Sequence, residues 1–514
     1  MRDVPATRRS RAWRRAIAWL LVATWIATAY WQTNKALPPG LHVDSPWYPT
    51  TPRDVTFIAD ITSADAYGRL SSSQAIFDEV LNVVGSAHKF IVLDYFLFNS
   101  QLGGSPESPP AFRQLSGELR DALIARRRAE PDLQVLFITD PINEVYGGVT
   151  SLDLRLLRAA GVEVIVTDLD ALRDSNFMYS SLWRLGIKWW SGDGRSGGAA
   201  QASPQNAAGG WLPNPLDESG DPISFGAWAR LLNFKANHRK VIVADDGHDG
   251  LVAIVGSANP HDASSAHSNA ALKVTGPAMV PLLRSELEVA RFSGWTGNLE
   301  AAAALDPPAP ADHMDGGRVK VLTEGGILTE LLARLDTAER GDNIDIAMFY
   351  LSDRAVIESL LAASRRGVVV RLIMDPNKDA FGRTKTGIPN QPVASELVAA
   401  SDGAIHVRWY RTHGEQFHTK LAMVYSPERF WLTVGSANLT RRNLADYNLE
   451  ANVAIEMPRS ARIAQQTITY FETLWTNKAS LGIEYTADFG YYADPSQLHY
   501  WLYRVMEGTG VSTF

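Results

Sequence analysis

The order of predicted helices and strands occurs twice in this chain. In the first half, the hydrophobic spacing predicts a helix, a buried strand, a second helix and a second strand over Ala75–Ala87, Phe90–Phe98, Phe112–Arg128 and Leu133–Thr139. The same series is predicted over Ile327–Arg340, Ile344–Tyr350, Arg354–Arg366 and Val368–Met374. Each series ends in an Asp-Pro pair, which begins at Asp140 and again at Asp375. The sequence therefore predicts an α/β protein built from two repeats.

The two repeats differ in length, which predicts an insertion in the first one. The chain from Asp140 to His238 is more than twice as long as the chain from Asp375 to His418. We predict repeats over residues 50–300 and 315–500, separated by an Ala- and Pro-rich linker, with the insertion at about residues 171–230. Within the insertion, residues 191–210 are rich in Gly, Ala and Ser and are predicted to be mobile.

The remainder of the insertion is aromatic and contains a short amphipathic pattern. Four large apolar residues recur at helical spacing, namely Met178, Leu182, Leu185 and Trp189. Arg184 and Lys188 add positive charge to the same segment. This helix can dock on a membrane interface or cover the core of the first repeat, and the sequence favours neither interpretation.

A short motif of side chains that can take part in catalysis follows each series of elements. Its first part is His-x-Lys, formed by His238 and Lys240 in the first repeat and by His418 and Lys420 in the second. His and Lys alternate along a predicted strand, so both side chains leave the same face of the sheet. The motif therefore brings an imidazole and an ammonium group together in each repeat.

The second part of the motif supplies groups that can hold an oxyanion. A Gly-Ser-Ala-Asn turn follows each His-x-Lys strand, and its predicted phosphate-binding residues are Ser257, Asn259, Ser436 and Asn438. This set of groups suits a phosphodiester, because one neutral imidazole can attack phosphorus while the other protonates the leaving alkoxide. The scheme needs no metal or other cofactor. The chain also has no cysteine, which excludes a thiol nucleophile and cysteine-ligated zinc.

With these motifs the sequence resembles the phospholipase D superfamily, whose motif H-x-K-x4-D is followed by G-S/G-x-N and occurs twice in single-chain members. The resemblance extends over about residues 55–480, and it is greatest to bacterial proteins of the cardiolipin and phosphatidylserine synthase type. It implies a duplicated α-β-α sandwich, in which two repeats pack as a pseudo-dimer around one shared active site. It also implies a covalent phosphohistidine intermediate on His238, with Asp245 completing the first motif.

The sequence departs from the pattern of this superfamily in two places. Tyr425 stands where the second motif should have its Asp. The superfamily also places a carboxylate some thirty residues after each His to orient it, and Glu450 fits this position after His418. After His238 the matching residue is Asn269, which can hold a tautomer but cannot stabilise an imidazolium by charge. We predict His238 as the nucleophile and retain His418 as the alternative.

The first 40 residues are predicted to be a signal or anchor segment. Residues 8–15 carry five arginines, and residues 16–31 are uncharged. Ala27-Thr28-Ala29 fits a cleavage site, whereas Tyr30 and Trp31 fit the interfacial belt of a retained anchor, and a buried amino-terminal helix is a third possibility. The arginines are expected on the cytoplasmic side, which places the body outside the cytoplasm, on the periplasmic side in a bacterium.

These features predict a phospholipid phosphodiester hydrolase or phosphatidyl transferase that acts at a membrane surface. The net charge of −7 becomes −12 without the six Arg and one Asp of residues 1–31, which disfavours nucleic acid as a partner. One alternative is a nuclease of the same superfamily. The other is a catalytically silent, membrane-tethered binding protein, which requires a broken motif, and Tyr425 is the only departure of that kind.

Overall fold

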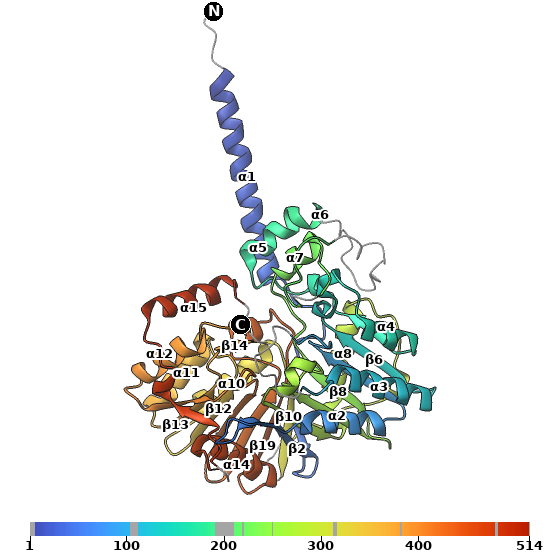
Figure 1. Ribbon diagram of the computed structural model, residues 1–514, viewed down its shortest axis with the longest axis vertical. Coiled ribbons are helices and arrows are strands. Elements are labelled where there is room, and N and C mark those ends of the chain that lie inside the picture. Colours follow the sequence, from blue (N-terminus) through green and yellow to red (C-terminus); the bar gives the residue numbers. More distant parts are fainter. Residues whose placement is uncertain are drawn as a thin grey trace, which may run out of the picture.

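Two large β-sheets, covered by helices, form the body of the molecule (Figure 1). The computed structural model describes residues 6–102, 112–190, 210–217, 220–248, 250–311, 316–380, 383–478, 482–512 and 514.

The first sheet belongs to the first repeat and has seven strands. Their order across the sheet is β2 (Val55–Asp60), β10 (Asn269–Thr275), β9 (Leu251–Gly256), β8 (Lys240–Asp245), β5 (Phe90–Tyr95), β6 (Gln134–Thr139) and β7 (Glu163–Val166). The last three strands are mutually parallel, and the other neighbours are antiparallel. Strands β5, β8 and β9 are buried on both faces, which explains why their sequences are almost continuously apolar.

The second sheet repeats this arrangement strand for strand. Its order is β11 (Gly317–Thr323), β19 (Ala451–Pro458), β18 (Arg429–Gly435), β17 (Lys420–Tyr425), β12 (Asn343–Met348), β13 (Val369–Met374) and β16 (Ile405–Tyr410). The short strands β1 (Tyr48–Thr50) and β20 (Thr486–Asp488) extend its two edges. The same strand order and the same parallel pairs confirm the predicted duplicated α/β fold. Two small hairpins lie outside the sheets, β3 (Thr62–Ala64) with β4 (Leu70–Ser72) and β14 (Asp379–Ala380) with β15 (Arg383–Thr384).

Helices cover both sheets and fill the space between them. The outer cores lie beneath α2 (Ala75–Ser86), α3 (Leu115–Ala129) and α4 (Leu152–Ala159) in the first repeat, and beneath α10 (Gly325–Thr337), α11 (Arg354–Arg365) and α12 (Asn390–Ala400) in the second. The central core combines the inner faces of both sheets with α8 (Val280–Phe292) and α14 (Arg462–Thr476). Because one apolar core contains residues of both repeats, burial of apolar area holds the two repeats together.

The insertion forms a helical segment beside the first repeat. It contains α5 (Phe177–Leu182), the π-helical turn η3 (Trp183–Ile187), α6 (Lys188–Trp190) and, further along, α7 (Phe225–Leu231). Trp183 is buried, whereas Trp189 is 68% exposed, so the predicted helix both packs on the body and presents apolar side chains to solvent. Most of the segment predicted to be mobile, residues 191–209, lies outside the described residues.

The amino-terminal helix α1 (Ala6–Asn34) projects from this end of the body (Figure 1). It contacts α5, and the Trp25 indole donates to the Met178 carbonyl at 3.0 Å. Large apolar residues of α1, including Trp19, Leu20 and Ile26, are exposed. Within the described part of the chain, no helix combines the length and the apolar character needed to cross a membrane.

Candidate active site

The two repeats are joined by short backbone bridges at their motifs. Asn237, just before the first motif, pairs in parallel with Leu449 of the second repeat. Ser268 of the first repeat pairs in the same way with Phe417, just before the second motif. The His238 N–H donates to the Leu449 carbonyl at 2.9 Å. Each His-x-Lys segment therefore begins beside a strand of the opposite repeat.

As a result of these bridges, each histidine is paired with a residue of the opposite repeat. His238 Nδ1 lies 2.8 Å from Glu450 Oε1, and His418 Nδ1 lies 3.1 Å from Asn269 Oδ1. The pairing expected within each repeat, Glu450 with His418 and Asn269 with His238, is therefore wrong. The spacing along the chain identifies the orienting residues, but only the packing of the repeats decides which histidine each one meets.

The serines of the two turns orient these partners. Ser257 Oγ donates to Asn269 Oδ1 at 2.9 Å, and Ser436 Oγ donates to Glu450 Oε2. The Asn443 amide, a contact that the sequence analysis missed, donates to Glu450 Oε1. Both serine hydroxyls thus orient the residue that binds a histidine, and their expected contact with a phosphate stays a prediction.

The asparagines of the turns are also buried at the site. Asn259 Oδ1 accepts from the Leu97 N–H at 3.2 Å, which orients this amide. Asn438 Oδ1 has no hydrogen-bond partner among the described residues, although it is buried. A buried polar atom without a partner is uncommon and is typical of a site that awaits a ligand or water.

The two lysines have matching environments. Lys240 Nζ donates to the His238 carbonyl at 2.6 Å, and Lys420 Nζ donates to the His418 carbonyl at 2.9 Å. Each ammonium group lies about 5 Å from the centre of an aromatic ring that also packs against the histidine of the same motif, namely Phe96 and Phe349. Phe96 and Phe349 were missed from the sequence, although each lies within a predicted buried strand. In the structure they follow directly after β5 and β12.

Electrostatics make the two histidines inequivalent. Burial lowers the pKa of His238 to about 4, Glu450 opposes this shift and Lys240 adds to it. Burial also lowers the pKa of His418, and the charges of Lys420, His267 and Lys240 lower it further without any opposing carboxylate. Both imidazoles are therefore neutral in the empty site at neutral pH, and only His238 has an anionic partner.

The charged partners respond to the same burial. Burial opposes ionisation of Glu450, but His238, Lys240 and the Ser436 hydroxyl together hold its pKa below the ordinary value. Burial lowers the pKa of Lys240 to about 7, although Glu450 opposes the shift. Burial and the neighbouring Lys240 lower the pKa of Lys420 as well. Since charges of one repeat shift groups of the other, both motifs contribute to one site.

The Asp of the first motif does not belong to this site. Asp245 lies at the far end of β8, about 16 Å from Lys240 at roughly 3.3 Å per residue. Its carboxylate accepts the backbone N–H groups of His88, Lys89 and Phe90, which fixes the connection between α2 and β5. The catalytic role expected for Asp245 is therefore corrected to a structural one.

Tyr425 stands at the corresponding end of β17. Its hydroxyl donates to Asp345 Oδ2 at 2.8 Å and accepts from Arg371. Because this end of the strand is structural in both repeats, the replacement of Asp by Tyr leaves the set of site residues intact.

A buried ion cluster, also missed from the sequence, supports the half of the site that contains the carboxylate. Arg239 donates to Glu324 Oε1 at 2.7 Å and to Glu286 Oε1 at 3.0 Å. Glu324 Oε1 also accepts the Glu450 N–H at 3.2 Å, and Glu324 adopts a positive φ of 49°, which is costly for a residue with a Cβ. In the second motif Thr419 replaces Arg239, so the Asn269 half has no equivalent ion pair.

Asp140 and Asp375, which end the predicted strands, hold the entry to each motif. Asp140 Oδ2 accepts the Asn237 N–H and Asp375 Oδ2 accepts the Phe417 N–H, both at 2.7 Å. Burial raises the pKa of each carboxyl to about 7. Both aspartates therefore have a structural role at the start of a motif.

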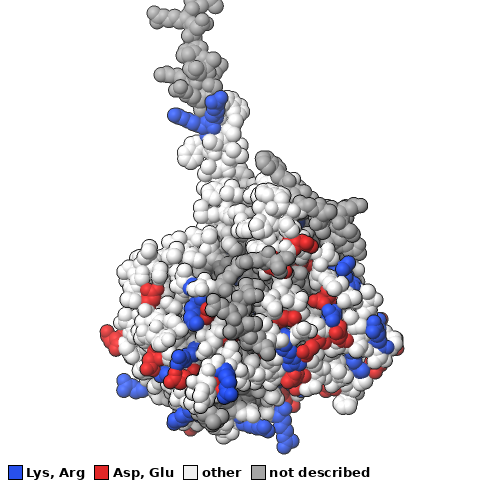
Figure 2. All heavy atoms as spheres, in the orientation of Figure 1, with Lys and Arg blue, Asp and Glu red and all other residues white. Residues whose placement is uncertain are grey.

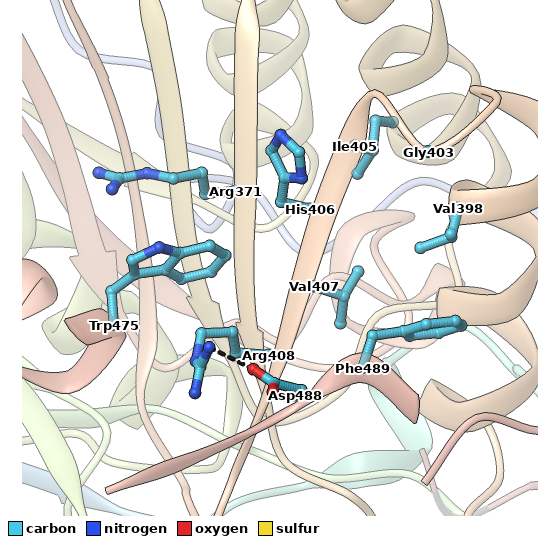
Figure 3. Close-up of a pocket in the computed structure, with 10 residues that line it drawn as sticks. All are labelled: Arg371, Val398, Gly403, Ile405, His406, Val407, Arg408, Trp475, Asp488 and Phe489. Carbon is cyan, nitrogen blue, oxygen red and sulfur yellow. Dashed lines mark hydrogen bonds and ion pairs between the residues drawn. The ribbon is translucent and has the colours of Figure 1, made fainter. Parts of the chain in front are cut away.

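The described residues contain no group of three His, Asp or Glu side chains that could hold a metal ion. A cavity of about 440 Å³ lies elsewhere, along β13 and β16 near the edge of the second sheet, and its lining includes His406, Arg371 and Trp475 (Figure 3). There the Arg408 guanidinium pairs with Asp488. This cavity contains none of the motif residues and is distinct from the histidine site.

Fold and site together define the class of this protein as a duplicated α/β protein with one composite site made from two His-x-Lys motifs. Residues 331–475 match the family model described as cardiolipin synthase, PLD-like domain. The match includes His418, Lys420 and Glu450, whereas the first motif lies outside it. No curated protein has a sequence that matches this chain.

One solved structure extends the likeness in fold over most of the chain. Phosphatidylserine synthase from Haemophilus influenzae is similar with a TM-score of 0.53 at 10% identity, over 93% of this chain and 96% of that one. Nuc, a phospholipase D family member from Salmonella typhimurium, covers 34% of this chain and 97% of its own, at 18% identity and a TM-score of 0.26. Polyphosphate kinase from Porphyromonas gingivalis covers 94% of this chain and 56% of its own, at 14% identity and a TM-score of 0.41. The family model thus confirms the predicted resemblance for residues 331–475, and the structure of phosphatidylserine synthase shows the same fold over most of the chain.

Proposed function

We propose that this protein cleaves a phospholipid phosphodiester and transfers the phosphatidyl group to water or to an alcohol. The observation that carries the proposal is the crossed arrangement of two His-x-Lys motifs in one buried site, with Glu450 on one imidazole and Asn269 on the other. The cardiolipin synthase-like match of the second repeat supports a lipid substrate, and so do the exposed apolar side chains near the insertion.

The hydrogen bond to Glu450 prepares His238 as the nucleophile. An ionised carboxylate can only accept, so Nδ1 of His238 carries the proton and Nε2 keeps its lone pair. The crossed pairing thus removes the objection that the missing carboxylate of the first repeat raised against His238. Glu450 also balances the positive charge that the imidazole gains when it bonds to phosphorus.

In the first step, Nε2 of His238 forms a bond to phosphorus, and the bond from phosphorus to the leaving alkoxide breaks. His418, protonated at Nε2, gives that proton to the alkoxide. Because His418 is neutral in the empty site, it takes up this proton when the anionic diester binds beside it and raises its pKa. Lys240 and Lys420 offset the charge on the non-bridging oxygens.

In the second step, water or an alcohol attacks the phosphohistidine. His418 now accepts the proton of the attacking hydroxyl, and the bond between phosphorus and His238 breaks. The free histidines are restored, so hydrolase and transferase differ only in the acceptor. No step in this scheme uses a metal, and we expect chelators to leave turnover unchanged.

The proposal is tested by incubating the full chain with mixed phospholipid vesicles, with and without glycerol, and resolving the lipid products. We expect His238→Ala and His418→Ala each to lower turnover by about 10² to 10⁴. His406→Ala, at an exposed histidine in the distant cavity, is the control and should keep full activity. Acid quench should trap phosphate on the peptide that contains His238. Full activity of either motif variant, or DNA cleavage faster than lipid turnover, contradicts the proposal.

A further inference from the structure

The carboxy-terminal helix α15 (Gln497–Thr509) exposes an apolar stripe on the side that faces away from the body. Its side chains Leu498, Trp501, Leu502 and Val505 recur at helical spacing and are exposed, Trp501 by 60% and Val505 by 58%. Its inner face carries the buried Glu507 and the Tyr503 hydroxyl, which bonds to Glu396. The Tyr503 ring also lies in the second outer core, and Tyr500 and Met506 pack against the same core. The helix therefore buries one apolar face and exposes a second apolar stripe, which has no apolar partner in the described part of the chain.

The end of α15 lies against the chain that leads into the helices of the insertion. Gly510, just after α15, adopts a positive φ of 72° and approaches the Ser175 carbonyl so closely that a Cβ would not fit. Ser175 lies two residues before α5, whose segment exposes Met178, Leu182, Leu185 and Trp189. Arg442 connects both parts, because its guanidinium donates to the carbonyls of Gly510 and Phe234.

Three segments far apart in the sequence therefore end on one side of the molecule. Helices α1, α5 and α15 all lie at the upper end of the body in Figure 1. In Figure 2 the upper left border of the body, where α15 lies in Figure 1, is almost entirely without charged side chains. The exposed stripe of α15 itself contains no charged residue. We call Leu498, Trp501, Leu502 and Val505 the α15 face.

We propose that the α15 face lies in the interface of a lipid bilayer, together with the exposed side of α5 and η3. Its composition fits this occupant, since a tryptophan with aliphatic neighbours and no charge gains by partial burial among acyl chains. This inference rests on the proposed function for the choice of lipid, and it names the surface that brings the enzyme to its substrate.

The path from this surface to the candidate site is short. Helix α13 (Arg441–Leu444) begins three residues after Asn438 of the second motif. Within it, Arg442 holds the chain after α15, and Asn443 donates to Glu450. Only the short helix α13 therefore connects the chain after α15, next to the bilayer, with Glu450, the residue that orients His238.

The absence of cysteine permits a direct test in the full chain. Val505→Cys is labelled with an environment-sensitive fluorophore and mixed with equimolar phosphatidylcholine and phosphatidylglycerol vesicles. We expect the emission to shift to the blue and to be quenched by brominated lipids. Val369→Cys is the matched control, because Val369 is 44% exposed but begins β13 in the second sheet, away from α15, and its label should not respond.

Three results overturn the inference. In the first, the label at position 505 keeps its aqueous spectrum although the protein sediments with vesicles. In the second, the labels at positions 505 and 369 respond equally to vesicles. In the third, the label at 505 shifts without vesicles as protein concentration rises, which assigns the face to a second copy of the chain. Turnover of lipid in detergent micelles by the same preparations tests the proposed function separately, because micellar substrate does not require docking.

Discussion

At the scale of single residues, the two histidines titrate in unusual ranges. His238 must be neutral to attack, and burial lowers its pKa to about 4, so activity should fall only as the pH drops through about 4. Lys240 must be charged, and its pKa of about 7 predicts a loss of activity as the pH rises through that value. We therefore expect kcat/KM for a soluble diester to fall below about pH 4, and to fall above about pH 7, where Lys240 loses its charge in addition to the proton that His418 must take up. An acid limb near pH 6.5 would contradict it.

Glu450 raises the pKa of His238, so Glu450→Gln should move the acid limb to lower pH. The same change removes the charge that balances the phosphohistidine, and kcat should fall by about 10² or more. Asn269→Asp adds a carboxylate beside His418 instead and should raise the pKa of that histidine. The opposite result would be an unchanged kcat for Glu450→Gln together with a shifted acid limb for Asn269→Asp. It would identify His418 as the nucleophile.

Glu324 acts on His238 through the backbone of Glu450 and is a positioning residue. Glu324→Ala removes the acceptor of the Glu450 N–H and should lower kcat by about 10 to 100 with little change in KM. Glu324→Gln keeps an acceptor oxygen and should restore most of this loss. Glu330→Ala is the control for a purely structural effect. This buried glutamate lies on α10, which begins directly after Glu324, and it pairs with Arg334 and Lys320.

At the scale of secondary structure, Asp245 fixes the connection between α2 and β5. Asp245→Ala leaves several backbone N–H groups without an acceptor and should lower the free energy of unfolding by about 1–3 kcal/mol. Turnover per folded molecule of a soluble diester should be preserved, since Asp245 lies far from the histidines. Denaturant unfolding and active-site titration measure the two effects. A large loss of kcat at unchanged stability would show that Asp245 takes part in catalysis.

The strands and motifs could be predicted because they depend on local patterns. The apolar run that ends at Thr139 reflects one element and appears in the structure as β6. The predicted strand of the first motif is shorter than expected, because β8 begins at Lys240 and His238 lies just before it. The partner of His238 could not be predicted, because the bridge between Asn237 and Leu449 depends on how two repeats pack. The α15 face escaped notice for another reason. Its apolar spacing is that of an ordinary buried helix, and only the fold shows which side faces solvent.

At the scale of the whole molecule, apolar contact should dominate association with lipid. Trp189 is exposed on the insertion, whereas Trp183 is buried, so Trp189→Ala tests the surface without disturbing the core. We expect weaker vesicle binding, unchanged hydrolysis of a short soluble diester and little effect of salt on the remaining binding. Nucleic-acid binding would instead weaken steeply with salt, because counterion release drives it. Cosedimentation over a series of salt concentrations distinguishes the two.

The crossed histidine pairs also bear on how such a chain can evolve. A substitution at Glu450 in the second repeat changes the hydrogen-bond partner of His238 in the first, and a substitution at Asn269 changes that of His418. Neither repeat can therefore lose its motif, or exchange it with a foreign copy, without damaging a residue pair that it shares with the other. Mutations in the two halves are inherited and selected together, while residues outside the shared site, such as Tyr425, are free to diverge between the copies.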